Sequence, residues 1–240
     1  IERENEIFDI LNSFNKAGLK YILIGGYAVS AYMHRFSVDA DICIDEGDLY
    51  SFRKILKAKH YTLTKRRILE DAYKGQFECY AKKVELPVTV DLLIGSVVSR
   101  QTNASVSFIQ LHNNSITKKI TGIEETVDAR IPSKEILIAL KLHSARMTDA
   151  RDIIALCKGI DFDVVAKFMR IGNSESVLNN LNRLLSYFKS DNFKDAFKGV
   201  FSIEKLPEGN INNGIRLVER LKTKVNASKL SKFRHHHIYI

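Results

Sequence analysis

The spacing of apolar residues changes near residue 131. Before that point, short apolar runs bounded by glycine or charged residues alternate with segments whose apolar residues recur every three to four positions. This pattern indicates strands mixed with amphipathic helices. After Pro132 almost all of the chain follows the helical period. The sequence therefore predicts an α+β fold: an α/β-type core with a mixed sheet over residues 1–131, followed by an all-helical domain over residues 132–240.

The elements expected in the first domain are short. Apolar residues at helical spacing predict helices at Glu2–Ala17, Tyr27–His34 and Asp48–Lys57. Apolar or alternating runs predict strands at Tyr21–Ile24, Val38–Ile44, Phe77–Lys82 and Val84–Ile94, the last two as a hairpin, and further strands around Val106–Leu111, Ile116–Ile120 and Glu125–Ala129.

The second domain is expected to contain helices only. They are predicted from Ser133 to about Met147 and at Asp149–Lys158, Phe162–Met169, Glu175–Phe188, Phe193–Phe201 and Gly214–Lys224. Several of these helices carry aromatic residues on their apolar faces. We expect these residues to belong to the core rather than to a surface that stacks on bases: Phe168, Tyr187, Phe188, Phe193 and Phe197.

Composition excludes several classes of protein. The 240 residues are 45% hydrophobic and 27% charged with three prolines, which excludes disordered and collagen-like chains. The longest uncharged apolar stretch, Tyr21–Met33, is well short of the ~20 residues of a membrane helix. The opening residues Ile-Glu-Arg-Glu do not resemble a secretory signal, so we expect a cytoplasmic protein without membrane association. The three cysteines, Cys43, Cys79 and Cys157, are widely spaced and are expected to be reduced thiols.

Positive charge is concentrated in the second domain. The net charge of +9 divides into +1 for residues 1–130 and +8 for residues 131–240, and residues 205–240 alone carry +6. Such an excess favours a polyanionic partner, although a basic helix that only faces solvent is an open alternative. The basic residues of this segment are Lys205, Arg216, Arg220, Lys222, Lys224, Lys229, Lys232 and Arg234. The run His235–His237 is more typical of a purification tag than of a metal site, because it consists of three consecutive histidines near a terminus.

Three aspartates in the first domain could form a metal site. Asp39 and Asp41 are two positions apart on a predicted strand, so they project to the same face with Cα atoms roughly 6–7 Å apart. A third, Asp91, lies between apolar residues of another predicted strand. A carboxylate there is costly unless it is paired or binds a metal. If the two strands are neighbours, the three carboxylates would converge and could hold two divalent cations, Mg²⁺ or Mn²⁺.

A glycine pair precedes the aspartates. Gly25 and Gly26 end the first strand and open a helix. Glycines at such a turn let backbone N–H groups and a helix N-terminus approach phosphates closely, although they could also serve only a tight turn. Ser30, in the helix that follows, could supply a hydroxyl to the same ligand.

Together these segments resemble the signature of the DNA-polymerase-β-type nucleotidyltransferase superfamily. Ile24-Gly25-Gly26, twelve residues, Asp39-Ala-Asp41-Ile42 and later Val90-Asp91-Leu92 match its three parts in order and spacing. Arg35-Phe-Ser37-Val-Asp39 resembles the Arg-x-Thr-x-Asp approach of bacterial and archaeal members, with serine in place of threonine. The second glycine stands where many relatives have a phosphate-binding serine. The resemblance implies that Asp39, Asp41 and Asp91 are catalytic metal ligands.

A second resemblance lies in the helical half. The helix that contains Lys141 and Arg146, followed by Asp149-Ala-Arg-Asp152, looks like the Lys…Arg…Asp-x-x-Asp segment of the AbiEii-type toxin and abortive-infection branch. Thr148 stands where that branch often has lysine. Lys141, on a small or apolar helix face, could reach a triphosphate or could face solvent. Arg146, Asp149 and Asp152 could assist binding or form an ion-paired helix junction.

The resemblance implies an enzyme that binds an NTP, such as ATP, and transfers a nucleoside monophosphate to a hydroxyl acceptor with release of pyrophosphate. The basic second domain favours RNA as the acceptor, and the family resemblance points to tRNA among RNAs. The branch would add a toxin–antitoxin role and a cognate antitoxin. Two alternatives stay open: a non-catalytic module that binds nucleotide or RNA, and an antibiotic-type adenylyltransferase acting on a small molecule. The three carboxylates argue against the first, because buried acids without a metal destabilise a fold.

Overall fold

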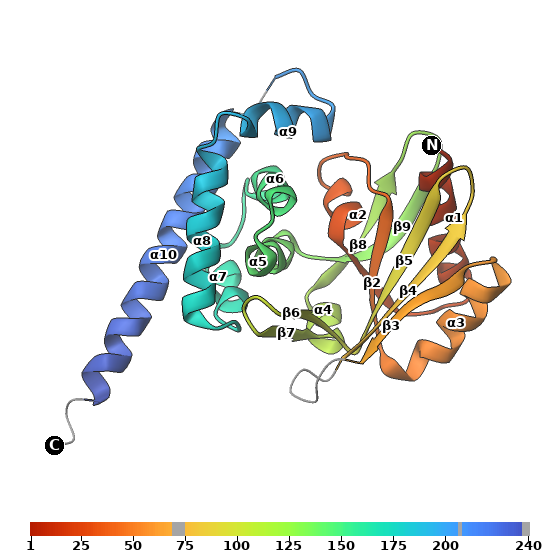
Figure 1. Ribbon diagram of the computed structural model, residues 1–240, viewed down its shortest axis with the longest axis horizontal. Coiled ribbons are helices and arrows are strands. Elements are labelled where there is room, and N and C mark those ends of the chain that lie inside the picture. The colour runs from red at the N-terminus through yellow and green to blue at the C-terminus, as the bar shows by residue number, and fades with distance from the viewer. Residues whose placement is uncertain (69–74, 206–207, 237–240) are drawn as a thin grey trace. The chain divides into compact units, whose positions relative to one another are not determined.

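The computed structural model describes residues 1–68, 75–205 and 208–236, and of residues 208 and 228–236 it describes the backbone alone. The chain divides into two compact units. Unit 1 comprises residues 1–98, 105–133 and 200–202, and unit 2 comprises residues 99–104, 134–199 and 203–240. The α+β prediction is confirmed: unit 1 contains a mixed sheet with helices, and helices dominate the C-terminal part (Figure 1).

The centre of unit 1 is a five-stranded mixed sheet in the order β1-β2-β5-β4-β3. Only the β2–β5 pair is parallel, and β1–β2, β5–β4 and β4–β3 are antiparallel. The strands are β1 (Tyr21–Ile24), β2 (Asp39–Ile44), β3 (Thr62–Ile68), β4 (Gln76–Lys83) and β5 (Pro87–Ile94). The predicted hairpin of β4 and β5 is confirmed, and the Asp91 strand is the neighbour of the Asp39–Asp41 strand.

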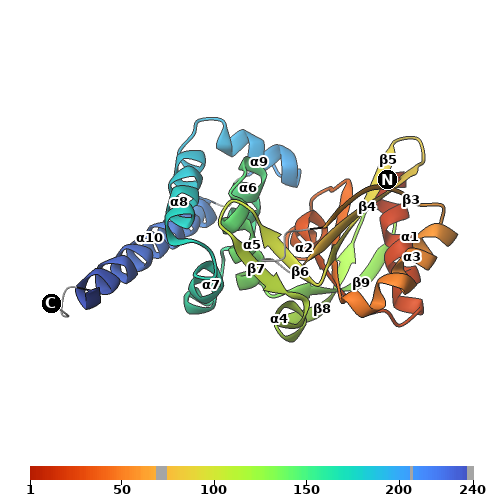
Figure 2. The same ribbon diagram turned by 60° about the horizontal axis from the view of Figure 1, so that its bottom comes forward.

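One face of this sheet is covered by helices. Along β5, Val88, Val90, Leu92 and Ile94 are buried while the residues between them are partly exposed. The buried face packs against α1 (Glu2–Lys16) and α3 (Leu49–Ala58), which lie side by side in both views (Figures 1 and 2). Phe14 of α1 and Phe52 of α3 meet edge to face with centroids 4.8 Å apart. The opposite face carries the aspartates.

Unit 1 contains further helices and strands besides this sheet. The helix α2 (Gly25–Ser30) follows β1 directly, and the short 3-10 helix η1 (Glu46–Asp48) precedes α3. Two further strand pairs are β6 (Ser96–Ser99) with β7 (Ala104–Ser107), and β8 (Ser115–Thr121) with β9 (Thr126–Pro132).

Part of the predicted strand around Val106–Leu111 is wrong. The strand β7 ends at Ser107, and Phe108–Asn113 forms the helix α4. The Ser107 hydroxyl accepts a hydrogen bond from the backbone amide of Gln110. In return, the side-chain oxygen of Gln110 accepts one from the backbone amide of Ser107. This capping box satisfies two amides that would otherwise have no partner and starts a helix inside an apolar run.

Unit 2 is built from packed helices. They are α5 (Lys134–Ser144), α6 (Met147–Leu156), α7 (Phe162–Met169), α8 (Ser174–Phe188), α9 (Phe193–Phe201) and α10 (Glu208–His236). Figures 1 and 2 both show α10 alongside α8. Four of the five aromatic residues expected in the core are buried, and Tyr187 is half-buried. Within the residues that the structure describes, no helix combines the length and the apolar character that crossing a bilayer requires.

Candidate functional site

The parallel pairing of β2 and β5 places Asp41 and Asp91 next to each other. The Cα atoms of Asp41 and Asp91 are register partners. Two residues earlier in β2, and so on the same face, Asp39 pairs with Thr89. The Thr89 hydroxyl donates a hydrogen bond of 2.6 Å to Oδ1 of Asp39. Asp39 is exposed, whereas Asp41 and Asp91 are half-buried. Three carboxylates therefore lie on one face of two neighbouring strands.

Asp91 has an unusual environment for an acid. Its Oδ1 is buried and accepts no hydrogen bond from any residue that the structure describes. Burial raises the pKa of Asp91 above its ordinary value, and the charge of Asp39 adds to the rise. A hydrogen bond with the Cys79 thiol and the charge of Lys65 act in the opposite direction. Burial also raises the pKa of the Cys79 thiol to about 11, so the thiol is protonated at neutral pH and can donate to the carboxylate.

The glycine turn lies against Asp41. Ile24, the last residue of β1, is the register partner of Asp41, and Gly25 follows it with φ +69°. A Cβ at Gly25 would overlap the Asp41 carboxylate, and one at Gly26 would overlap the side chains of Arg35 and Ser37. Both positions thus require glycine, the first for its backbone conformation and both for space.

The loop between α2 and β2 packs on the glycine turn. The Tyr27 hydroxyl donates to the Ser37 carbonyl at 2.8 Å. Ser30 is buried, and its hydroxyl accepts a 3.5 Å hydrogen bond from the Arg35 backbone amide. Arg35 and Ser37 lie against the turn at Gly26, whereas Ser30 is directed to the loop.

The carboxylates meet part of the requirements of a divalent metal. Among the described residues, no group of three or more His, Cys, Asp or Glu side chains is placed so that it could hold a metal ion. Mg²⁺, however, is commonly held by one or two carboxylates together with waters and substrate phosphates. The unpartnered Oδ1 of Asp91, beside Asp41, is an oxygen that a cation would satisfy. The residues present therefore fit a cation that arrives with a phosphate ligand.

The candidate residues of unit 2 form one ion-paired cluster. Nζ of Lys141 lies 3.2 Å from Oδ1 of Asp149 and 2.7 Å from Oδ2 of Asp152, and all three side chains are buried. Asp149 also accepts hydrogen bonds from Ser144 and from the amide and guanidinium of Arg146. Burial raises the pKa of Asp149, but Arg146, Lys141 and Ser144 outweigh it and lower the pKa to about 2. The cluster joins α5 to α6.

The basic segment near the C-terminus is partly engaged within unit 2. Nζ of Lys224 lies 2.6 Å from Oδ1 of Asp163, and Arg220 stacks 4.0 Å from the centroid of the Phe162 ring. Arg216 is exposed and Lys222 is half-buried. The side chains of Lys229, Lys232 and Arg234, and all of His237, lie outside the described residues.

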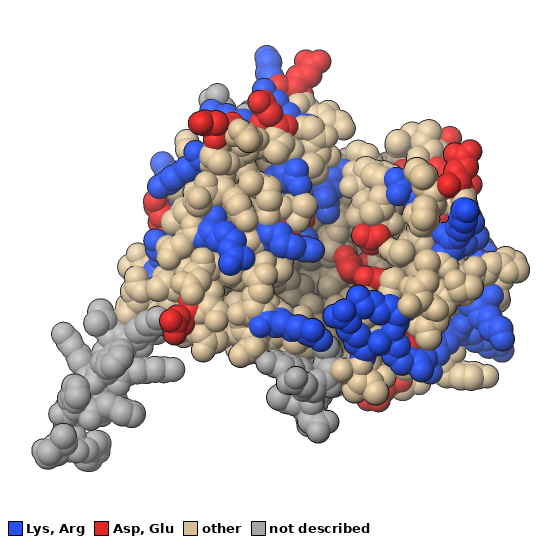
Figure 3. Space-filling model, in the orientation of Figure 1, with Lys and Arg blue, Asp and Glu red and all other residues tan. Residues whose placement is uncertain are grey.

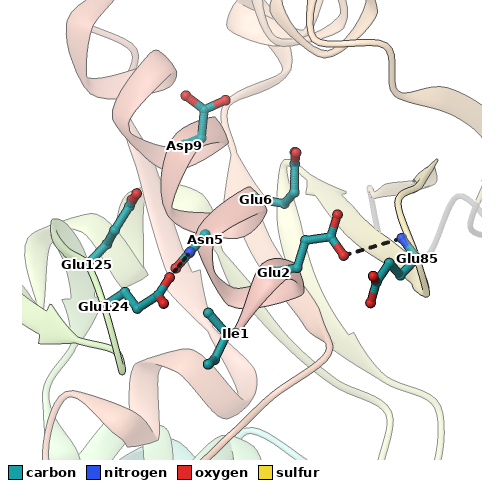
Figure 4. Close-up of a pocket in the computed structure, with 8 residues that line it drawn as sticks. All are labelled: Ile1, Glu2, Asn5, Glu6, Asp9, Glu85, Glu124 and Glu125. Atoms are coloured by element: carbon teal, nitrogen blue, oxygen red, sulfur yellow. Dashed lines mark hydrogen bonds between the residues drawn. The ribbon is translucent and has the colours of Figure 1, made fainter.

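A cavity of about 770 Å³ lies elsewhere in unit 1, at the N-terminal end of α1 (Figure 4). Its lining is mostly acidic, and several of its side chains already have partners, including Glu6 with Lys82 and Asp9 with Lys59. The lining residues are Ile1, Glu2, Asn5, Glu6, Asp9, Glu85, Glu124 and Glu125. An acidic cavity repels phosphates, so the carboxylate face beside the glycine turn is the better candidate for a nucleotide.

Sequence reasoning missed two residues that lie in the same row of the sheet as Asp91. Cys79 is the register partner of Asp91 on β4, and Lys65 is the partner of Cys79 on β3. The strand β3 was not predicted, because its residues are exposed throughout and its sequence does not alternate between apolar and polar. Its three consecutive basic residues, Lys65 to Arg67, were the available signal.

Comparisons with known proteins agree with this architecture. No protein-family model matches the sequence, and a search of curated proteins finds no match. A solved structure from H. pylori, described as a "putative nucleotidyltransferase", is 17% identical, with 94% of this chain and 96% of that chain covered at a TM-score of 0.51. Another H. pylori structure, JHP933, is 18% identical, with 98% and 97% covered at a TM-score of 0.49. The chain is therefore similar in fold to the first of these proteins over nearly its whole length.

Proposed function

We propose that the chain is a Mg²⁺-dependent nucleotidyltransferase that transfers a nucleoside monophosphate from an NTP to a hydroxyl group of RNA. The observation that carries the proposal is the register of β2 and β5, which puts Asp41 beside Asp91 while Gly25 lies against the Asp41 carboxylate. The fold similarity to the H. pylori protein supports the same reaction class. Residues 1–131 would hold the chemistry and residues 132–240 would contribute to recognition.

Each residue of the carboxylate face has a role in this proposal. Asp39 and Asp41 would hold the cations, Mg²⁺ or Mn²⁺, and Asp91 would complete the site. Bound cations would neutralise phosphate charge and lower the pKa of the attacking hydroxyl. Gly25 and Gly26 would admit the β- and γ-phosphates to the start of α2. A larger side chain at either position would displace Asp41 or the Arg35 and Ser37 side chains.

The reaction would be an in-line displacement. The acceptor hydroxyl oxygen attacks the α-phosphorus, a new P–O bond forms, and the bond to the β-phosphate breaks so that pyrophosphate leaves. The hydroxyl proton passes to Asp91 or to water. This chemistry asks the protein mainly for positioning and charge neutralisation, which the carboxylate face and the glycine turn can provide.

Unit 2 is assigned a supporting role. Lys141 is proposed to contact nucleotide, and Arg146, Asp149 and Asp152 to fix its position through the ion-paired cluster. The +8 charge of residues 131–240 supports RNA over a cationic small molecule as acceptor. In its more specific form, the proposal adds that the chain acts as a toxin of the AbiEii type with a cognate antitoxin.

The proposal is tested by labelled-nucleotide transfer. The purified chain is incubated with each of the four α-labelled NTPs, Mg²⁺ and total cellular RNA, or with cellular protein or an aminoglycoside in place of RNA. We expect label in RNA with one preferred NTP, and mass spectrometry of RNA from expressing cells should show an added nucleotide. Label in protein or aminoglycoside alone would reject RNA as acceptor, and no label in any of the three would reject the enzyme.

A further inference from the structure

The edge strand β3 carries a basic surface on the same side of the sheet as the aspartates. Lys65 is the register partner of Cys79, which is the partner of Asp91, which is the partner of Asp41. These residues form one row across four strands and share one face. Arg67, two positions further along β3, shares this face. Lys65 and Arg67 are here called the basic edge.

A register shift in β3 produces this orientation. Leu63 pairs with Tyr80, but the next pair is Lys65 with Cys79, so Thr64 is an extra residue in the strand. The Thr64 hydroxyl donates to the Cys79 carbonyl at 3.1 Å. Without the extra residue, Thr64 would pair with Cys79 and Lys65 would point to the opposite face. Bulges that redirect a side chain in this way are common beside functional sites.

Arg66 fixes the strand in this register. Its guanidinium is directed to the opposite face, where Nε lies 2.6 Å from Oε1 of Glu78. Arg53 of α3 binds the same carboxylate, and the Tyr80 hydroxyl donates to it at 2.7 Å. Glu78 is fully buried, so β3 is joined to the helical layer through a buried acid. The alternation around this contact leaves Lys65 and Arg67 on the aspartate face.

The basic edge is available to a ligand. Lys65 and Arg67 are exposed, and within the described residues neither forms an ion pair. Figure 3 shows Lys and Arg side chains gathered over the β3 end of the sheet, with acidic side chains beside them. Lysine and arginine on an edge strand can also protect that edge from pairing with another chain, but such protection does not require them to face the aspartates.

The order of the strands indicates which phosphate groups would bind at the basic edge. The glycine turn follows β1, on one side of the Asp41–Asp91 pair, whereas β3 is the edge strand on the other side. In an in-line displacement the leaving pyrophosphate and the attacking hydroxyl lie on opposite sides of the reacting phosphorus. If the triphosphate occupies the glycine turn, the acceptor approaches from the β3 side. Lys65 is two strands from Asp91, about 10 Å between Cα atoms.

We propose that the basic edge binds the phosphate backbone of a single-stranded RNA end and directs its terminal hydroxyl toward Asp91. The Cα atoms of Lys65 and Arg67 are roughly 6–7 Å apart along the strand, a spacing comparable with that of successive phosphates in an extended nucleic acid. This inference rests on the proposed function and adds the direction from which the acceptor arrives. Lys65 and Arg67 act as binding and positioning residues.

The test compares two double variants of equal charge change. Lys65→Gln with Arg67→Gln removes the basic edge, and Lys54→Gln with Lys57→Gln removes two exposed lysines of α3, on the opposite face. Binding of a 5′-labelled single-stranded RNA is measured by fluorescence anisotropy over a series of salt concentrations without NTP. Two lost phosphate contacts should reduce the slope of log K against log salt by about 1.4. The α3 variant should keep a slope closer to that of wild type.

Steady-state kinetics provide a second measurement. We expect the KM for RNA to rise about tenfold or more in the basic-edge variant, while the KM for NTP stays within about twofold of wild type. If wild type transfers nucleotide to RNA and both double variants bind and react alike, the inference is wrong although the proposed function stands. A rise in the KM for NTP alone would assign the basic edge to the triphosphate and would also overturn it. Absence of transfer by wild type would instead reject the proposed function.

Discussion

The α-carbon of Gly25 faces the carboxylate of Asp41 so closely that a methyl group on Gly25 would overlap its oxygen. The two residues are brought together because β1 and β2 are antiparallel and Ile24 is the register partner of Asp41. Gly25 of the glycine turn and Asp41, the second aspartate of the Asp-x-Asp pair, are sixteen residues apart in sequence and are thus one structural feature.

This contact predicts the effect of Gly25→Ala. The variant would both strain a left-handed backbone and displace Asp41, whereas Gly18→Ala, at φ +67° with open space around its α-carbon, would only strain the backbone. We expect Gly18→Ala to lower the free energy of unfolding by about 1–2 kcal/mol with nucleotide transfer unchanged. Gly25→Ala should cost more stability and reduce transfer at least tenfold. Urea unfolding measures the stability and labelled-NTP transfer measures the activity. Equal transfer by the two variants would show that the glycine turn takes no part in the reaction.

The adjacent carboxylates predict stabilisation by metal. Burial raises the pKa of Asp91 and the charge of Asp39 raises it further, so the acids oppose one another when no cation is present. A cation that binds only the folded state adds stability by mass action, about 2.7 kcal/mol at a concentration 100 times its Kd. Mg²⁺ or Mn²⁺ should therefore raise the Tm of wild type, and EDTA should reverse the rise. Asp41→Asn should lose most of the increase, and an unchanged increase in this variant would place the cation elsewhere.

The strands β1, β2 and β5 show how much of the candidate site could be predicted from the sequence. Glycine after a four-residue apolar run, Asp-x-Asp on one strand and an acid inside another were enough to locate the carboxylate face, because each is a local pattern. That β2 and β5 are neighbouring strands cannot be derived from a local pattern. From the sequence it could be stated only as the condition under which the three carboxylates would converge. The structure supplies it as a parallel register between Asp41 and Asp91.

The features that the sequence did not predict correctly were missed for physical reasons. The strand β3 is an exposed edge, so burial never imposed an apolar alternation on it. The helix α4 begins inside an apolar run that looks like a strand, although the Ser107-x-x-Gln110 capping box was a readable signal. Lys141 was expected on a small or apolar face, but its acidic partners come from the next helix, α6, and helical spacing within α5 cannot show them.

The buried ion pairs of Glu78 predict a dependence of stability on pH. Burial raises the pKa of Glu78, but Arg53, Tyr80 and Arg66 outweigh it and lower the pKa from 4.5 to about 2. Because the folded-state pKa is the lower one, this stabilisation is complete above the unfolded pKa and is lost as pH falls toward 2. Since both arginines are more than a third exposed, we expect about 1–3 kcal/mol rather than the full value of the shift.

Acid titration of Glu78→Gln measures this contribution. The difference in unfolding free energy between wild type and the variant should be constant above about pH 5 and shrink as pH falls to 2. Glu46→Gln, an exposed acid in η1, should show a smaller difference or none. A gap between wild type and Glu78→Gln that does not change with pH would mean that the charge of Glu78 contributes nothing.

The ion-paired cluster predicts that Lys141 has a structural role in addition to its proposed contact with nucleotide. Lys141→Met would leave Asp149 and Asp152 buried without their ammonium partner, at a cost of about 3–5 kcal/mol. Adding Asp152→Asn should recover part of this loss, because one of the buried charges is removed. The KM for NTP of the stabilised double variant then isolates the nucleotide contact: a raised value supports it, and a wild-type value assigns Lys141 to structure alone.

The most direct test of the account is nucleotide transfer by Asp41→Asn. This substitution keeps the size of the side chain that lies between Gly25 and Asp91 and removes its charge. Glu46→Gln, which removes one carboxylate charge just beyond the C-terminal end of β2, is the matched control. With the preferred labelled NTP, Mg²⁺ and RNA, we expect Glu46→Gln to transfer label like wild type and Asp41→Asn to be at least 100-fold slower, about 2.7 kcal/mol of lost transition-state stabilisation. Transfer by folded Asp41→Asn at the wild-type rate would contradict the assignment of the reaction to this face of the sheet.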